Sequence, residues 1–206
     1  YANYVTPNRA IASASYTINE GPHAATKLGL FYEGYNIGFF STYSYSRISY
    51  LMNNVSGAGT ASQLIYIPTD SDLNGMTFSS DANKSEYKSF IESDKYLKNH
   101  RGEFMKRNAI AAPWLNRFNL KVAEDFYLNV AGKKHTLEIA ADVNNLGNLI
   151  NNSWGIYKQI STTSVLTYQA DTTEKTMKYT FTKPEWRNYN DISSTWQMLF
   201  SVRYSF

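Results

Sequence analysis

Cysteine is absent from the sequence, and its absence removes several classes of protein at once. A chain without cysteine has no disulfide scaffold, no thiolate metal site and no cysteine nucleophile. The absence does not fix a cellular compartment, because many exported proteins also fold without disulfides.

Charge and long apolar runs are also scarce. Charged residues make up 18% of the chain, and the formal net charge is only +3. Because the basic residues are scattered, nucleic acid is not an expected partner. No apolar run approaches the roughly 20 residues that a membrane-spanning helix requires. Any crossing of a membrane would therefore have to use strands.

Aromatic residues are in excess, at 16% of the chain, with 17 Tyr and 11 Phe. Tyrosine joins an apolar ring to a polar hydroxyl and favours strands over helices. We therefore predict an all-β fold built from antiparallel strands with a wet side.

The clearest strand is predicted near residues 195–206. Even positions from Trp196 to Phe206 are apolar, and odd positions are nearly all polar. Its length is close to the roughly 9 to 11 residues with which a tilted strand crosses a bilayer. The alternative is the last strand of a soluble sandwich, but an apolar face of this length ending in Phe206 exceeds what a sandwich edge usually carries.

Five further strands are predicted from similar alternation. If the two faces meet lipid and lumen, Arg117, Lys121 and Arg203 must point inward, because a Lys or Arg facing lipid at mid-bilayer costs about 2–4 kcal/mol. Glu124 and Asp125 are expected to be solvated at the end of their strand. The five predicted strands lie near residues 9–18, 25–33, 38–50, 114–128 and 135–144.

Long and short connections mostly alternate between these strands, as in membrane barrels with short turns on one rim and long extracellular loops on the other. The long loops are 51–113 and 145–194. We expect a short helix in the first loop, between Lys84 and Leu97, and a buried strand-like tract at residues 64–67. Six strands cannot close a barrel, since the smallest have about eight. The chain is therefore expected to be part of a larger barrel.

Several segments resemble the Oar-like TonB-dependent receptors of Bacteroidota, in the order found in that family. Together they cover nearly the whole chain. The segments are DKYLKNHRGEFMKRNAIAAPWLNRFNLKVAEDF (Asp94 to Phe126), LFYEGYNIGFFSTYSYS (Leu30 to Ser46), LIYIPTD (Leu64 to Asp70), DVNNLGNLINNSWG (Asp142 to Gly155) and STWQMLFSVRYSF (Ser194 to Phe206).

The resemblance implies a plugged barrel of about 22 strands in the bacterial outer membrane, of which residues 1–206 would be the C-terminal part, without the plug and N-terminal barrel. Such receptors import, or less commonly export, a bulky ligand with energy relayed by TonB. The implied partners are the rest of the barrel and its plug, TonB through a region outside this sequence, outer-membrane lipid and surface lipoproteins. Tyr204 and Phe206 resemble the C-terminal signal read by the barrel-assembly machinery.

Eight residues are candidates for ligand contact. The simpler interpretation is that the charges of the lumen pair with one another or with the plug. Glu138 and Asp142, four apart on one strand face, are interpreted as lumen lining rather than as a catalytic acid pair. The candidates are Arg117, Lys121, Glu138, Asp142 and Arg203 on strands, and Tyr66, Tyr87 and Trp154 in loops.

No enzyme, cofactor or metal site is expected. His23, His100 and His135 are isolated and lack metal-ligand spacing. Residues 52–61 contain no carboxylate, so calcium is not expected there. No combination of nucleophile, base and orienting group is visible. The competing hypothesis to transport is a structural role, as an adhesin or as a scaffold of an outer-membrane complex.

Overall fold

The computed structural model describes residues 2, 5, 6, 8–55, 62–171 and 176–206. It is mostly β, with 54% of residues in strands and 17% in helices, and it contains several antiparallel sheets. The chain forms two compact units. The sheet unit comprises residues 6–36, 114–157 and 188–206, and the insert unit comprises residues 1–5, 37–113 and 158–187.

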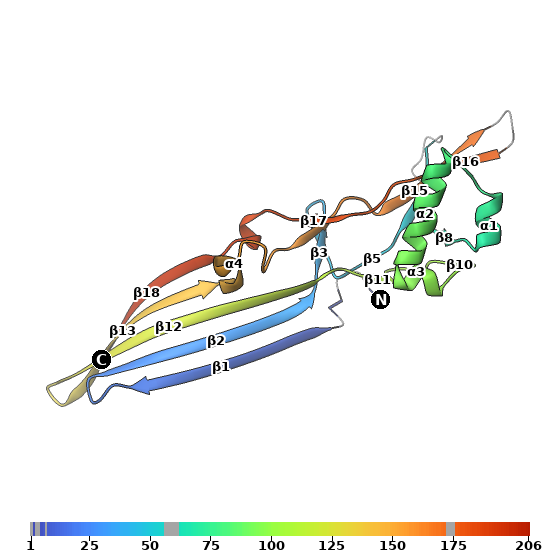
Figure 1. Ribbon diagram of the computed structural model, residues 1–206. Coiled ribbons are helices and arrows are strands. Elements are labelled where there is room, and N and C mark those ends of the chain that lie inside the picture. The colour runs from blue at the N-terminus through green and yellow to red at the C-terminus, as the bar shows by residue number, and fades with distance from the viewer. Residues whose placement is uncertain (1, 3–4, 7, 56–61, 172–175) are drawn as a thin grey trace. The chain divides into compact units, whose positions relative to one another are not determined.

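The sheet unit is built on one five-stranded sheet in which every pair of neighbouring strands is antiparallel (Figure 1). Neighbours in the sheet are also consecutive among its five strands along the chain, so the sheet is a meander. The strands, in sheet order, are β1 (Arg9–Asn19), β2 (Ala24–Asn36), β12 (Trp114–Val130), β13 (Lys133–Asn144) and β18 (Gln197–Ser205).

Short and long connections alternate strictly in this meander. Residues 20–23 join β1 to β2, and Ala131 and Gly132 join β12 to β13. The φ angles of Ala131 and Gly132 are 52° and 83°, the left-handed pair that a two-residue hairpin turn requires. Both turns lie at one end of the sheet. At the other end of the sheet, the long connections 37–113 and 145–196 join β2 to β12 and β13 to β18.

The predicted sixth strand over residues 38–50 is wrong. The structure has three short strands there, namely β3 (Gly38–Phe40), β4 (Tyr43–Tyr45) and β5 (Arg47–Ile48). The chain reverses between β3 and β4, where Ser41 takes a left-handed φ of 54° and Phe40 pairs with Tyr43. Tyr43, Ser44, Tyr45 and Ser46 alternate between aromatic and polar side chains after the turn, and this alternation is why the sequence predicts one strand there.

The insert unit contains the remaining sheets and ties its own ends together. The backbone N–H of Ile37 donates to the carbonyl of Pro113 at 3.2 Å, and that of Ser161 donates to the carbonyl of Glu185 at 2.9 Å. A four-stranded sheet has the order β17 (Trp186–Asn188), β14 (Lys158–Ile160), β3, β4. A five-stranded sheet has the order β7 (Ser62–Leu64), β6 (Leu51–Asn54), β15 (Ser164–Asp171), β16 (Thr176–Phe181), β9 (Thr77–Phe78). Two small sheets pair β8 (Tyr66–Ile67) with β10 (Glu103–Phe104), and β5 with β11 (Ile110–Ala111).

The first long loop is helical where one helix was predicted, but the structure has two consecutive helices there. They are α2 (Asp81–Ser93) and α3 (Lys95–Asn99). Between them the carboxylate of Asp94 accepts from the N–H groups of Tyr96 and Leu97, at 2.8 and 3.0 Å, and starts α3 as its N-cap. A further short helix, α1 (Asp70–Gly75), precedes them.

The core of the insert unit lies under these helices. Ile65 and Ile67 are fully buried together with Ile91 and Leu97, as the apolar tract at residues 64–67 predicted. Among the described residues, no helix has both the length and the apolar character needed to cross a membrane.

Candidate functional site

The five-stranded sheet has one face that is apolar over most of its area. Cross-strand register places Val122 opposite both Leu28 and Ala141, and Ile139 opposite Val202. We call this surface the apolar face. Its large side chains include Tyr16, Leu28, Leu30, Tyr32, Phe118, Leu120, Val122, Phe126, Leu137, Ile139, Val143, Met198, Phe200, Val202 and Tyr204.

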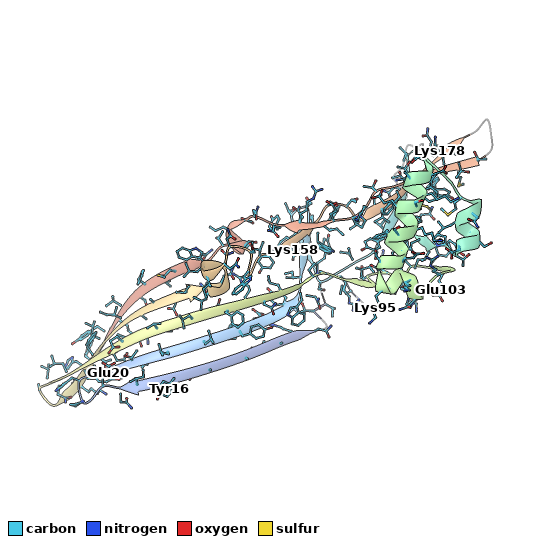
Figure 2. The ribbon with its side chains drawn as sticks, viewed as in Figure 1. Tyr16, Glu20, Lys95, Glu103, Lys158 and Lys178 are labelled. Carbon is cyan, nitrogen blue, oxygen red and sulfur yellow. The ribbon has the colours of Figure 1, made fainter. Side chains whose placement is uncertain are left out.

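The apolar face is open to solvent in this chain. Phe200 and Val202 are 72% and 71% exposed, and Tyr16 is 67% exposed. Figure 2 labels Tyr16 on β1, one of the two outer strands. Contiguous exposed apolar patches larger than a few hundred Å² mark contact surfaces with protein or membrane in most proteins.

The opposite surface, which we call the polar face, carries all five strand residues predicted for ligand contact. Lys121 lies opposite Asp142, and Glu138 lies opposite both Asp125 and Arg203. Glu138 and Asp142 have different partners, so they do not form an acid pair. The polar face also carries Arg9, Ser13, Ser15, Thr17, Lys27, Glu33, Asn119, Asn144, Gln197 and Ser201.

A charge cluster crosses three strands of the polar face. The Nζ of Lys27 on β2 lies 2.5 Å from Oδ2 of Asp125 on β12 and 3.3 Å from Oε2 of Glu138 on β13. The hydroxyl of Tyr127 donates to the same oxygen of Asp125 at 3.0 Å. Asp125 is only 3% exposed, which corrects the expectation of a solvated carboxylate. Its position between β2 and β13 encloses it, and Lys27 supplies the compensating charge.

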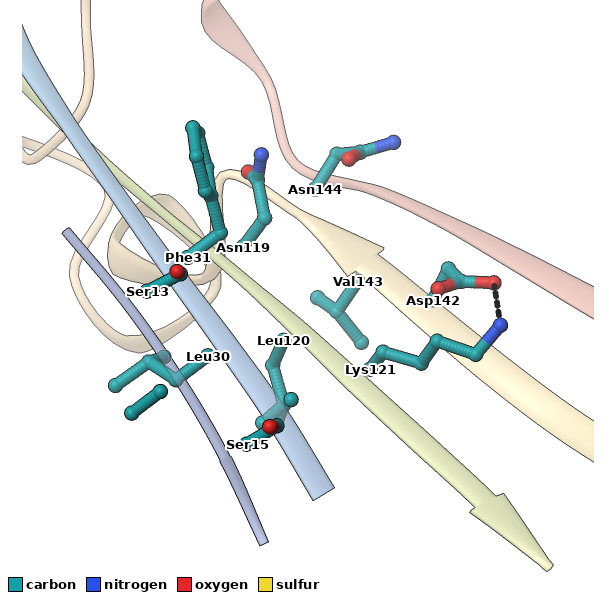
Figure 3. Close-up of a pocket in the computed structure, with 12 residues that line it drawn as sticks. Ser13, Ser15, Leu30, Phe31, Asn119, Leu120, Lys121, Asp142, Val143 and Asn144 are labelled. Carbon is teal, nitrogen blue, oxygen red and sulfur yellow. Dashed lines mark ion pairs between the residues drawn. The ribbon is translucent and has the colours of Figure 1, made fainter. Parts of the chain in front are cut away.

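A groove lies on the polar face (Figure 3). It has a volume of about 380 Å³. Lys121 and Asp142 lie together in it, with Nζ and Oδ2 3.9 Å apart. Other polar side chains that line it come from β1, β12 and β13, namely Ser13, Ser15, Asn119 and Asn144.

A second hollow of about 300 Å³ shares Asn119 and Asn144 with the groove. It adds Glu33 and Arg117, so the two hollows together present charges of both signs and neutral amides. Such a lining can hold a hydrated polar ligand by hydrogen bonds.

Arg117 contacts Tyr157, which is itself paired with Tyr35. Its Nη1 donates to the hydroxyl of Tyr157 at 3.1 Å, and its guanidinium carbon lies 5.5 Å from the centre of that ring. The hydroxyl of Tyr35 lies 3.3 Å from that of Tyr157. These contacts orient Arg117 in the lining of the second hollow.

Asn145, which sequence reasoning missed, organises the connection at this end of the sheet. Its side chain is fully buried, and it has a left-handed φ of 56°. Its N–H donates to Oδ1 of Asn119 at 2.9 Å, and its Nδ2 donates to the carbonyls of Gly155 and Ser194 at 3.0 and 3.2 Å. The sequence feature that could have pointed to Asn145 is the short run directly after it, which forms the helix α4 (Leu146–Ile150).

The predicted loop residues have three different surroundings. The hydroxyl of Tyr66 donates to Oδ2 of Asp72 at 3.0 Å, and its ring meets the exposed ring of Phe104 edge-on. Trp154 is 56% exposed. Tyr87, on α2, is 0% exposed and belongs to the core, so its prediction as a ligand contact is wrong: the ring packs between Phe78 and Phe181.

Tyr204 and Phe206, at the end of the chain, are 59% and 82% exposed. Both rings stack with His135, and the hydroxyl of Tyr204 is hydrogen-bonded to His135 Nδ1.

Among the residues that the structure describes, no group of three or more His, Asp or Glu side chains is placed to hold a metal ion. Residues 56–61 of the segment in which calcium was not expected lie outside that description. Comparisons with protein-family models, with curated proteins and with solved structures find no match.

Proposed function

We propose that this chain is part of the wall of an outer-membrane β-barrel, and that the complete barrel is a TonB-dependent transporter of the Oar-like kind. The observation that carries the proposal is the five-stranded meander with one exposed apolar face and one polar face. In this proposal the apolar face meets lipid and the polar face lines the lumen, where Arg117, Lys121, Glu138, Asp142 and Arg203 lie.

Strand length supports a membrane span. The strands contain 11, 13, 17, 12 and 9 residues in sheet order. A tilted transmembrane strand needs about 9 to 11. Aromatic residues lie toward the two ends of the apolar face, with Tyr32 and Phe118 in tilted ring contact toward one end and Phe126 and Tyr204 toward the other, as in interfacial girdles.

Open edges support incorporation into a larger sheet. Neither β1 nor β18 has a second partner among the described strands, and each is exposed along its whole length. An unpaired edge presents backbone donors and acceptors that cannot remain unsatisfied in lipid. Further strands, from the same polypeptide or another chain, would complete the wall.

Transport rather than a purely mechanical role is supported by the polar face. The two adjoining hollows carry both charges and amides, and the resemblance of the sequence to Oar-like receptors supplies TonB and the plug as partners. The ligand would be bulky and polar. The bacterial outer membrane is the proposed location.

A structural role is the second candidate, as an adhesin or as the scaffold of an outer-membrane complex. The observation that favours it is the insert unit, which has its own core and exposes Tyr43 and Phe104 by 68% and 65%. This role predicts stable protein partners and no dependence on TonB.

The chain has no cysteine, so single cysteines can report which face meets lipid. Ser201→Cys and Val202→Cys place neighbouring labels on opposite faces of β18. In outer-membrane vesicles, a fluorophore at position 202 should be quenched by nitroxide lipids, and one at position 201 by a water-soluble quencher. Equal quenching of both labels by the aqueous reagent would contradict the barrel.

Transport is tested separately on the polypeptide purified from its native outer membrane. A species several times larger than 23.5 kDa that crosslinks to TonB supports the transporter. A stable species of about 23.5 kDa, bound to other surface proteins and not to TonB, favours the scaffold.

A further inference from the structure

The insert unit contains a pocket of about 620 Å³, larger than either hollow of the polar face. Its walls come from β3 to β7 and from the turn at Arg107 and Asn108. Small-molecule sites usually have volumes of about 300–1,000 Å³. The pocket is therefore large enough for a small organic molecule.

Its charge is of one sign. Arg47 and Arg107 both line it, and the described lining residues include no Asp or Glu. Arg107 is exposed and makes no ion pair with any residue that the structure describes. Other arginines of the same unit behave differently, since Arg101 and Arg187 lie 3.0 and 2.9 Å from carboxylate oxygens.

The turn that carries Arg107 is fastened to β5 and its neighbouring residues by hydrogen bonds. Arg47 Nη1 donates to the carbonyls of Asn108 and Ala109, at 3.2 and 3.0 Å. The N–H of Asn108 donates to the Ser49 hydroxyl at 2.7 Å, and Asn108 takes a left-handed φ of 54°. A site that is ordered before the ligand arrives loses less entropy on binding.

The rest of the lining mixes apolar side chains with polar ones, which are Ser49, Ser62, Asn108 and Thr163. Phe40 and Tyr45 contribute rings, and Ile48, Leu51 and Leu64 contribute aliphatic surface. A ligand with a charged head and an apolar body therefore finds partners for both of its parts.

We propose that this pocket binds an organic anion, with a carboxylate or phosphate-ester head and an aromatic or aliphatic body. The guanidinium of Arg107 would pair with the oxyanion, because its planar donors match two oxygens at once. The body would lie against Phe40 and Leu64. The inference goes beyond the proposed wall and lumen, and it stands whether or not the ligand is transported.

Calorimetric titration of the detergent-purified protein tests it with three probes: phenyl phosphate, phenylacetate and the neutral phenylacetamide. We expect saturable binding of at least one anion, weaker at high salt, and much weaker binding of the amide. Arg107→Gln should weaken anion binding about tenfold, the cost of one charge-assisted hydrogen bond. Arg187→Gln, an exposed arginine of the same unit outside the pocket, should leave binding unchanged.

Ser62→Asp provides a second variant, since it places a carboxylate in the lining and leaves the hydrogen bonds from Arg47 to Asn108 and Ala109 in place, and it should also weaken binding. Phosphate-only or carboxylate-only binding would each support the proposal and identify the head group. The proposal is overturned if neither anion saturates, if the amide binds equally well, or if Arg187→Gln weakens binding as much as Arg107→Gln. These outcomes leave the quenching test on β18 unaffected, so failure of the pocket and failure of the barrel are distinguishable.

Discussion

Asn145 and Gly155 fit against each other with no room for another atom. Nδ2 of Asn145 donates to the carbonyl of Gly155 at 3.0 Å, and a Cβ added to Gly155 would lie 1.9 Å from Oδ1 of Asn145. Gly155 also has a left-handed φ of 62°. Since Asn145 in turn binds Asn119 on β12, this contact connects the segment after β13 to the polar face.

Gly155→Ala should therefore destabilise the protein. The left-handed backbone alone costs a residue with a Cβ about 1–2 kcal/mol, and the clash with Asn145 adds to it. Denaturant unfolding followed by tryptophan fluorescence measures the loss. Gly147→Ala is the matched control, because its Cβ would lie 3.6 Å from Trp154, an ordinary contact. Equal stability of the two variants would contradict this account of the Asn145 contact.

Lys27→Met should destabilise the sheet by about 1–3 kcal/mol, because it leaves the buried carboxylate of Asp125 without its countercharge. Lys121→Met is the control. Its ion pair with Asp142 is longer, at 3.9 Å, and both side chains are at least one-third exposed, so a change within about 1 kcal/mol is expected. Urea titration of the detergent-solubilised proteins gives both values. If the two variants lose the same stability, the Lys27 cluster has no special role.

Val122→Lys tests whether the apolar face meets lipid, by the stability that a charge on this face costs. The residue lies in the middle of β12, and a Lys facing lipid near mid-bilayer costs about 2–4 kcal/mol. Ser13→Lys adds the same charge to the polar face and should cost far less. Folding of each variant into lipid vesicles, followed by urea titration, makes the comparison. Comparable folding of the two would count against a lipid-facing surface.

Asp72 should make the stability of α1 depend on pH. Its pKa is lowered from 3.8 by hydrogen bonds from the hydroxyl of Thr69, the N–H of Thr69 and the hydroxyl of Tyr66, in that order, against an opposing contribution from burial. Because the pKa is lower in the folded state, this stabilisation is complete above the ordinary value and disappears as the pH falls through the lowered one.

The stability difference between the native protein and Asp72→Asn should consequently be constant near neutral pH and shrink on acidification below about pH 4. Thermal unfolding followed by far-UV circular dichroism measures it. Asp81→Asn is the control, since the carboxylate of Asp81, in the first turn of α2, has no hydrogen bond with a described residue. A difference that persists unchanged into strong acid would contradict the assignment.

Much of the sheet could be predicted because alternation is a local property. β13 and β18 alternate between strongly apolar and polar residues, and both were located within a few residues. β1 gave a weak signal because its two faces carry Ala10, Ala12 and Ala14 against Ser13 and Ser15, residues of similar size. The turn at Ser41 could not be found, since a left-handed residue other than Gly, Asn or Asp has little local signature.

Some residues of the candidate site could likewise be predicted from local sequence, and others could not. Placement of Arg117 and Lys121 on one face follows from strand period alone. The cluster of Lys27 with Asp125 and Glu138 depends on how β2, β12 and β13 pair, which no local pattern contains. Tyr87 was misassigned because helical spacing identifies an apolar stripe without showing whether the core covers it.

The backbone bonds at the base of the insert unit bear on how the sheet assembles. β1 with β2, and β12 with β13, are hairpins that can form from neighbouring residues, whereas pairing β2 with β12 must bring together segments separated by residues 37–113. Loop closure costs entropy that grows with the length of free chain. The bond from Ile37 to Pro113 lets the insert bring its own ends together as it folds. The two hairpins would then meet as preformed pieces on a short tether, and the sequence between them could lengthen or change with little penalty to the rate at which the wall forms.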